Sequence, residues 1–208
     1  MSKKHPVVAV TGSSGAGTTT VKRAFEHIFY RDGIKAAVIE GDSFHRYDRA
    51  SMKEEMAKAA AEHRSLSHFG PEANVFDQLE GLFRTYGETG GGKKRYYIHS
   101  DPEAKELNAR LGTNLDPGQF TPWEDIPERT DLLLYEGLRG LVITAGNNVA
   151  RHVDLGVGVV PIVALAGTCM GFWARSRGLG LLPSLAAGIL FVGCGPLYSR
   201  VLAGNETA

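Results

Sequence analysis

The stretch of sequence that decides the fold is Gly12-Ser13-Ser14-Gly15-Ala16-Gly17-Thr18-Thr19-Thr20. It follows the apolar run Val7-Val8-Ala9-Val10 and precedes a segment, residues 21–29, with apolar residues at helical spacing. This order predicts a buried strand, a glycine-rich loop and a helix, the context that a phosphate-binding loop needs. Glycines let backbone N–H groups turn toward an anion, and the helix N-terminus adds partial positive charge. We therefore expect these nine residues to bind nucleotide phosphates. An ordinary strand-turn-helix corner is the structural alternative.

The loop departs from the usual phosphate-loop pattern at one position. The pattern G-x-x-x-x-G-K-[ST] fits at Gly12 and Gly17, but Thr18 stands where lysine is expected. The hydroxyl of Thr19 is still available to hold Mg²⁺. Without the lysine, other cations must supply the positive charge that the β- and γ-phosphates need.

Polar residues follow the second predicted strand, residues 36–39. The strand-helix-strand unit predicts parallel pairing of the first two strands and a right-handed crossover. Because ligands bind beyond the C-terminal ends of such strands, we expect Asp42 near the loop. Asp42 could accept a proton from an attacking hydroxyl, and a helix cap is its alternative role. His45 and Arg49, four residues apart, are expected to share a helix face and bind a substrate phosphate, with a solvated charged face as the alternative.

A third apolar strand ends in an acid, in the sequence Asp131-Leu132-Leu133-Leu134-Tyr135-Glu136-Gly137. In proteins with a phosphate-binding loop, an acid at the end of a strand beside the first strand orients Mg²⁺. We therefore expect Glu136 in the metal shell together with Thr19. A polar strand end that faces solvent is the alternative.

The composition limits the size of the fold and the kinds of partner that we expect for this chain. The chain has 208 residues, enough for one domain or slightly more, with 23 basic and 23 acidic residues. This balance gives no general attraction to nucleic acid, and we expect no nucleic-acid partner. Cys169 and Cys194 are too far apart for a metal pair and are expected to be small buried residues in a reducing cytosol. The N-terminus has no signal-peptide core, so we expect a cytoplasmic location.

Together these motifs resemble the bacterial phosphoribulokinases, within the phosphoribulokinase and uridine kinase family. The resemblance covers residues 5–163, and its family also has threonine in place of the loop lysine. Its most specific motifs are residues 10–22, 40–47, 67–74 (Ser-His-Phe-Gly-Pro-Glu-Ala-Asn), 120–125 (Phe-Thr-Pro-Trp-Glu-Asp) and 135–138.

The resemblance implies an α/β fold of the P-loop NTPase class, with a nucleoside-monophosphate-kinase-like, mainly parallel sheet flanked by helices. It implies transfer of the γ-phosphoryl of ATP to the 1-hydroxyl of ribulose 5-phosphate, which gives ribulose 1,5-bisphosphate in the Calvin cycle. Asp42 would be the catalytic base, His45 and Arg49 would bind the sugar phosphate, and Thr19 and Glu136 would serve Mg²⁺. The family also implies a homo-oligomer that NADH activates.

The resemblance ends abruptly after residues 158–163. The family continues with a helix that brings lysine, arginine and aspartate to the transferring phosphoryl, and residues 164–177 do not match it. We therefore expect a P-loop kinase domain at residues 1–163, truncated at its C-terminus, and an unmatched apolar tail at residues 164–208. Since phosphoryl transfer depends on electrostatic stabilisation, activity should be impaired. A smaller departure is Arg139, where the family has histidine.

The tail leaves alternatives open. Residues 155–174 and 178–199 are uncharged, and each stretch reaches the roughly 20 residues that cross a bilayer. A two-helix membrane hairpin is one reading; a non-native ending, from a shifted frame, a fusion or an artificial sequence, is the preferred one. The functional alternatives are a non-catalytic ATP-binding fragment and another small-molecule kinase, such as a uridine kinase relative.

Overall fold

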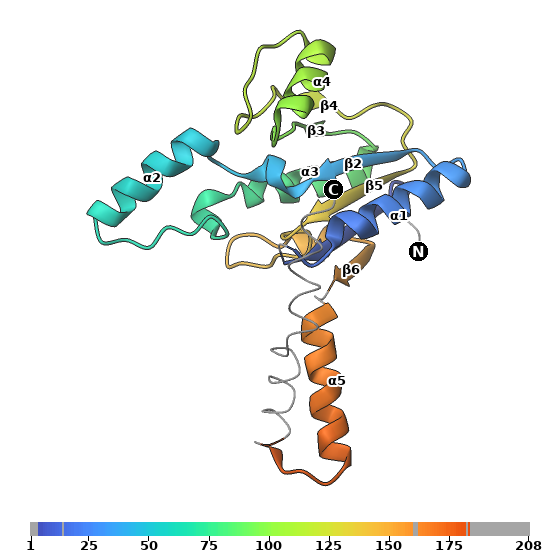
Figure 1. Cartoon of the computed structure of the whole chain (residues 1–208). Coiled ribbons are helices and arrows are strands. Elements are labelled where there is room, and N and C mark those ends of the chain that lie inside the picture. Colours follow the sequence, from blue (N-terminus) through green and yellow to red (C-terminus); the bar gives the residue numbers. More distant parts are fainter. Residues whose placement is uncertain (1–3, 14, 160–161, 182, 184–208) are drawn as a thin grey trace. The chain divides into compact units, whose positions relative to one another are not determined.

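A computed structural model of the chain describes residues 4–13, 15–159, 162–181 and 183 (Figure 1). The described residues of Met1–Gly12 and Thr18–Gly158 form one compact unit, and those of Ser13–Gly17 and Val159–Ala208 form another. The first unit contains the sheet and most of the predicted site residues.

The sheet has four strands in the order β2-β5-β1-β6. Its strands are β1 (Val7–Gly12), β2 (Ala36–Glu40), β5 (Leu132–Gly137) and β6 (Leu155–Val159). β1 and β2 both pair in parallel with β5, so the prediction that the first two strands pair directly is wrong. The almost wholly apolar β5 occupies the position between them, which is buried on both faces. The C-terminal ends of β1, β5 and β2 therefore meet at one edge of the sheet.

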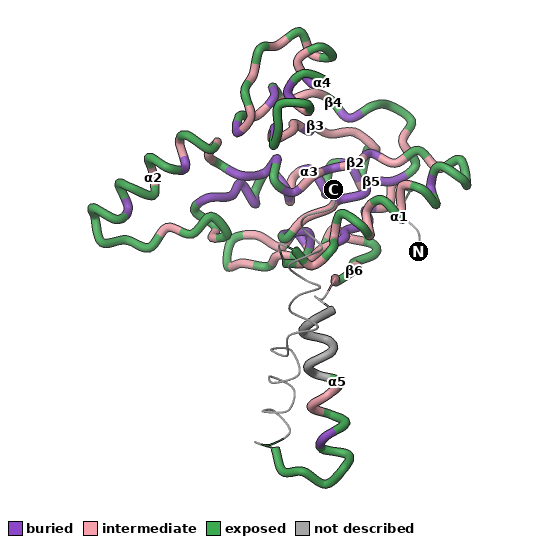
Figure 2. Tube along the Cα trace, in the orientation of Figure 1, coloured by how far each residue is buried: buried purple, intermediate pink, exposed green. Residues whose placement is uncertain are grey.

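The core follows the alternation of side chains along these strands. Alternate strand residues, among them Val7, Ile39 and Tyr135, pack with buried residues of α3 (Phe76–Thr89). The intervening residues, such as Val8 and Leu134, are buried on the other face, and α1 (Thr18–Arg31) contacts β1 and β5. Figure 2 shows β5 as buried along most of its length. The apolar residues Phe76, Leu79, Leu82 and Phe83 form one buried stripe of α3.

The segment after β2 differs from the prediction. It forms the short 3₁₀ helix η1 (Gly41–Phe44), then an extended stretch, then α2 (Arg49–Ala61). His45 is extended and bridges Asn74, whereas Arg49 is the first residue of α2, which Asp48 caps by accepting a hydrogen bond from the Ser51 N–H at 2.8 Å. The prediction that His45 and Arg49 share a helix face is therefore wrong, because the helix begins after His45.

Smaller elements complete the first unit. They are η2 (Pro71–Ala73), α4 (Asp101–Leu111), η3 (Val149–His152) and a two-stranded antiparallel sheet of β3 (Lys93–Lys94) and β4 (Glu124–Asp125). Sequence analysis had not predicted α4.

The second unit contains α5 (Ile162–Ser176). The uncharged stretch 155–174 is not one helix, because residues 155–159 form β6. In the part of the chain that is described, no helix has the length and apolar character to cross a membrane. Most of the second uncharged stretch, from residue 184 onward, lies outside the described residues, as does Cys194. Cys169 is exposed on α5, so the expectation that it is buried is wrong.

Candidate active site

The glycine-rich loop lies between the end of β1 and the start of α1, which confirms the predicted order of strand, loop and helix. Gly15 and Gly17 have φ angles of +76° and +95°, a backbone conformation that glycine adopts without strain. The N–H of Ala16 donates to the carbonyl of Ser13 at 3.0 Å. Ser14 lies outside the described residues. Phosphate binding by the loop stays a prediction.

At the start of α1, two threonine hydroxyls meet the acid that ends β5. The Thr18 hydroxyl donates to Glu136 Oε1 at 2.5 Å, and the Thr19 hydroxyl lies 3.4 Å from the same oxygen. The structure thus brings together Thr19 and Glu136, the two residues predicted for Mg²⁺. Hydroxyl and carboxylate oxygens suit Mg²⁺, which binds through one or two carboxylates and keeps the rest of its shell for water and substrate phosphate. The described residues contain no group of three or more His, Cys, Asp or Glu side chains that could hold a metal ion.

Sequence analysis missed a cation beside this pair. Lys22 Nζ donates to Glu40 Oε1 at 2.7 Å and lies 4.0 Å from Glu136 Oε2. Burial of Lys22 acts to lower its pKa, but the hydrogen bond to Glu40 and the charges of Glu40 and Glu136 outweigh it, so the pKa is raised. Lys22 is therefore a protonated, largely buried cation between the ends of β2 and β5. Its spacing of four residues from Thr18, on the same helix face, was the signal that could have found it.

Asp42 lies in η1, directly beyond the end of β2. Its Oδ1 is 3.4 Å from Nε2 of His45, its Oδ2 is 3.8 Å from Nε2 of His99, and 53% of its side chain is exposed. The hydrogen bond from His45 lowers the pKa of Asp42; burial raises it, and the charges of His45, His99 and Arg139 lower it further. The net effect is a lowered pKa, so Asp42 is an ionised and accessible carboxylate. The ionised form can accept a proton, although the lowered pKa makes Asp42 a weaker base than an ordinary carboxylate.

The two predicted substrate-binding residues have different surroundings. His45 is buried, and its ring stacks on that of His68 with 4.1 Å between centroids and 37° between planes. Arg49 is exposed at the start of α2, where its N–H donates to the carbonyl of Gly118 at 2.9 Å. The structure therefore brings His45 to Asp42 and leaves the Arg49 side chain at the surface.

Arg95 is a second residue that sequence analysis missed. Its guanidinium lies 3.8 Å from the ring centroid of Phe120 and 4.7 Å from that of Trp123. It donates to the carbonyls of Ser43 at 2.8 Å and His45 at 2.6 Å, and burial lowers its pKa. Arg95 therefore holds the backbone on the C-terminal side of Asp42. The basic and aromatic run at residues 93–99 was the available signal.

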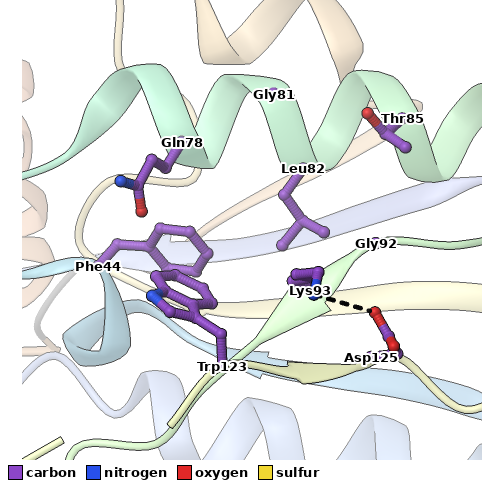
Figure 3. Close-up of a pocket in the computed structure, with 9 residues that line it drawn as sticks. All are labelled: Phe44, Gln78, Gly81, Leu82, Thr85, Gly92, Lys93, Trp123 and Asp125. Carbon is purple, nitrogen blue, oxygen red and sulfur yellow. Dashed lines mark ion pairs between the residues drawn. The ribbon is translucent and has the colours of Figure 1, made fainter.

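A pocket of about 540 Å³ lies beside this region (Figure 3). From α3, Gln78 points toward Phe44 and Leu82 points toward Lys93, and Lys93 pairs with Asp125 at 3.7 Å. Its other lining residues are Gly81, Thr85 and Gly92. The lining is mostly apolar and includes none of the predicted site residues. This pocket is therefore separate from the site that contains Asp42 and Glu136.

Comparisons with known proteins show which family the chain belongs to. The model of the family described as "Phosphoribulokinase / Uridine kinase family" matches residues 7–167. A phosphoribulokinase from Nitrobacter vulgaris is 53% identical over 166 residues, which cover 79% of this chain and 55% of that protein. A probable phosphoribulokinase from Escherichia coli K12 is 56% identical over 165 residues, with the same coverage.

Solved structures of kinases also match this chain. The phosphoribulokinase from Rhodobacter spheroides has a TM-score of 0.66 and 39% identity, and the match covers 96% of this chain and 68% of that one. A putative fructose transport system kinase from Silicibacter, with a TM-score of 0.50 and 16% identity, shares the fold alone. These matches confirm the predicted P-loop kinase fold, a parallel sheet flanked by helices. The chain spans about half the length of the curated relatives it matches, 55% in both cases. Within that span, the match to the family model shows that the chain belongs to the phosphoribulokinase and uridine kinase family.

Proposed function

We propose that this chain is the catalytic core of a phosphoribulokinase. It transfers the γ-phosphoryl of ATP to the 1-hydroxyl of ribulose 5-phosphate and forms ribulose 1,5-bisphosphate and ADP, in carbon fixation by the Calvin cycle. The observation that carries the proposal is the ionised Asp42 carboxylate beyond β2, within 3.8 Å of two imidazoles and one strand away from the Glu136–Thr18 hydrogen bond. The names of the relatives support the choice of acceptor.

Each site residue has a role in this proposal. Asp42 accepts the proton of the 1-hydroxyl while that oxygen bonds to the γ-phosphorus and the bond from phosphorus to the β-γ bridging oxygen breaks. The loop residues 12–20 hold the ATP phosphates, and His45 and Arg49 bind the phosphate of the acceptor. Thr19 and Glu136 would hold Mg²⁺, which neutralises charge on the phosphates.

The rate should be lower than that of a chain with the family's cationic helix. Residues 164–177 do not match that helix, and Thr18 removes a further cation from the loop. Lys22 is held by Glu40 and Glu136, so its charge is already largely compensated. A non-catalytic ATP-binding fragment is therefore the second candidate function, favoured by the absence of the loop lysine and of a match to the family's cationic helix.

Three further properties belong to the proposal because the family resemblance implies them: activation by NADH, assembly into a homo-oligomer and a cytoplasmic location. Titration of the protein with NADH, monitored by fluorescence, and sedimentation velocity test the first two. Fractionation of the source cells tests the third.

A substrate panel tests the choice of acceptor. ADP release is measured with MgATP and either ribulose 5-phosphate or uridine, at the same concentrations. The proposal predicts ADP release with ribulose 5-phosphate and none above background with uridine. Release with uridine alone would identify a uridine kinase relative, and MgATP binding without release would identify the non-catalytic fragment.

A further inference from the structure

Buried polar atoms without a hydrogen-bond partner gather around His68. Three of them in the described part of the chain are His45 Nδ1, Asn74 Oδ1 and Arg139 Nε. The His45 ring stacks on His68, and the His68 carbonyl accepts hydrogen bonds from Asn74 Nδ2 at 3.2 Å and Arg139 Nη2 at 3.0 Å. Since buried polar groups are normally paired, such a concentration of unpaired atoms indicates a place where a polar ligand binds.

Arg139 is the unusual member of this group. It is 5% exposed, yet no carboxylate among the described residues forms an ion pair with it. A guanidinium does not lose its proton in proteins, so Arg139 is a buried cation with a free N–H. Burial lowers the pKa of Arg139 and the charge of Asp42 acts to raise it, but Arg139 and Asp42 form no ion pair. A buried charge without an ion-pair partner is destabilising unless something pairs with it, and an anion is such a partner.

The surroundings of Arg139 indicate which anion. Its hydrogen bond goes to the loop that contains His68, and its charge lowers the pKa of both Asp42 and His68. It therefore lies on the side of Asp42 and His45, where the acceptor is proposed to bind. Thr18 and Lys22, in contrast, are engaged with Glu136 and Glu40. His68, at the edge of the cluster, is exposed, whereas His45, Asn74 and Arg139 are buried.

The geometry points to Arg139 as a residue that binds the phosphate group of the phosphorylated acceptor, through its Nε–H and next to His45. This inference rests on the proposed function for the identity of the acceptor. The free Nε–H and the fixed positive charge of Arg139 suit a phosphate oxygen better than a neutral hydroxyl. Arg139 is thus a specificity residue for phosphorylated over unphosphorylated sugars.

Two variants separate this role from a merely structural one. Arg139→Gln keeps a hydrogen-bond donor for the His68 carbonyl but removes the charge, and Arg139→Lys keeps the charge. If Arg139 only anchors the carbonyl, both variants bind the acceptor like the unaltered protein. If Arg139 binds phosphate, Arg139→Gln loses affinity for it, and Arg139→Lys retains part of that affinity. Arg84→Gln, an exposed arginine on α3, is the matched control.

The experiment is isothermal titration of the full chain with ribulose 5-phosphate, with ribulose, and with MgATP. We expect Arg139→Gln to weaken ribulose 5-phosphate binding at least about tenfold, the effect of losing a charged hydrogen bond, and to leave ribulose and MgATP binding unchanged. Arg84→Gln should match the unaltered protein. Equal affinity for ribulose 5-phosphate in Arg139→Gln and the unaltered protein would overturn the inference, as would a loss confined to MgATP.

This readout is independent of turnover. If the unaltered chain binds ribulose 5-phosphate through Arg139 but releases no ADP, the inference holds and the proposed function fails. If it releases ADP and Arg139→Gln has an unchanged KM for ribulose 5-phosphate, the inference fails and the proposed function holds. Should Arg139→Gln not fold, Arg139→Lys decides: a partial loss of affinity for ribulose 5-phosphate with unchanged affinity for ribulose supports the inference, and an unchanged affinity for ribulose 5-phosphate contradicts it.

Discussion

Asp42 provides the most direct test at the scale of single residues. Its carboxylate is half exposed and paired only loosely with two imidazoles, so it contributes little packing. We expect Asp42→Asn to lower kcat by roughly 10²–10⁴, the range for loss of a general base, and to lower the melting temperature only slightly, because the lowered pKa of Asp42 contributes some stability at neutral pH. Steady-state kinetics and thermal unfolding measure both. Asp116→Asn, at another exposed aspartate, is the control, and a kcat for Asp42→Asn equal to that of the control would rule out a catalytic role.

The electrostatic interactions of His68 with Asp42 and Arg139 can be tested without measuring turnover. Partial burial, followed by the charges of His45 and Arg139, lowers the pKa of His68, whereas the charge of Asp42 raises it. Removing a positive charge makes protonation easier, so Arg139→Gln should raise the pKa of His68. Removing a negative charge makes protonation harder, so Asp42→Asn should lower it further. NMR titration of the His68 imidazole measures both shifts, and shifts of the same sign in the two variants would contradict the described geometry.

The residues that sequence reasoning found are those that stand at strand ends. Asp42 and Glu136 each follow an apolar strand, and the topology of parallel sheets puts such positions at one edge. Arg139 and His68 are separated by 71 positions in the sequence and meet only through a side chain and a carbonyl. No local pattern marks such a contact, because it depends on how the loop at residues 67–74 folds back.

At the scale of elements, the ends of β2 and β5 approach closely around the buried Tyr135. A Cβ added to Gly137 would lie 2.9 Å from the Gly41 Cα and 3.0 Å from the Tyr135 hydroxyl, and its φ is +154°. We therefore expect Gly137→Ala to destabilise the protein by about 1–3 kcal/mol and to lower kcat, because Glu136 and Asp42 flank this contact. Denaturant unfolding measures the change.

Gly81 on α3 is the matched control for that substitution. A Cβ there would meet nothing within 4 Å, and the residue is inside a helix. Gly81→Ala should therefore stabilise the protein by roughly 0.5–1 kcal/mol through helix propensity. If both alanine variants changed stability by the same amount and sign, the close approach of β2 and β5 would not be the cause.

The elements that could be predicted have strong periodic signals. β1, β2 and β5 are apolar runs, and the stripe of α3 is regular. The expectation that the strand ending in Glu136 lies beside β1 is confirmed, but the insertion of β5 between β1 and β2 was not predicted, because β5 lies far along the sequence. α4 was missed although Gly112, with a φ of +67°, ends it in the usual left-handed conformation. Its weakly amphipathic sequence gave no clear helical stripe.

At the scale of the whole molecule, two observations favour different outcomes. The match to relatives favours an active phosphoribulokinase, whereas the unmatched cationic helix favours an impaired one. The family model extends to residue 167, slightly past the boundary at 163 that remains our prediction for the kinase domain. α5 begins at Ile162, in the second unit. Turnover is therefore the property that the proposal has to demonstrate, because residues 164–177 do not match the family's cationic helix.

Analysis of the reaction products tests this turnover most directly. The purified chain is incubated with MgATP and ribulose 5-phosphate, and the products are identified by ³¹P NMR. The account predicts ADP and ribulose 1,5-bisphosphate in equal amounts, and neither when ribulose 5-phosphate is left out. Bound MgATP with no bisphosphate formed, or ADP released equally without the acceptor, would contradict the claim that this chain is a phosphoribulokinase core.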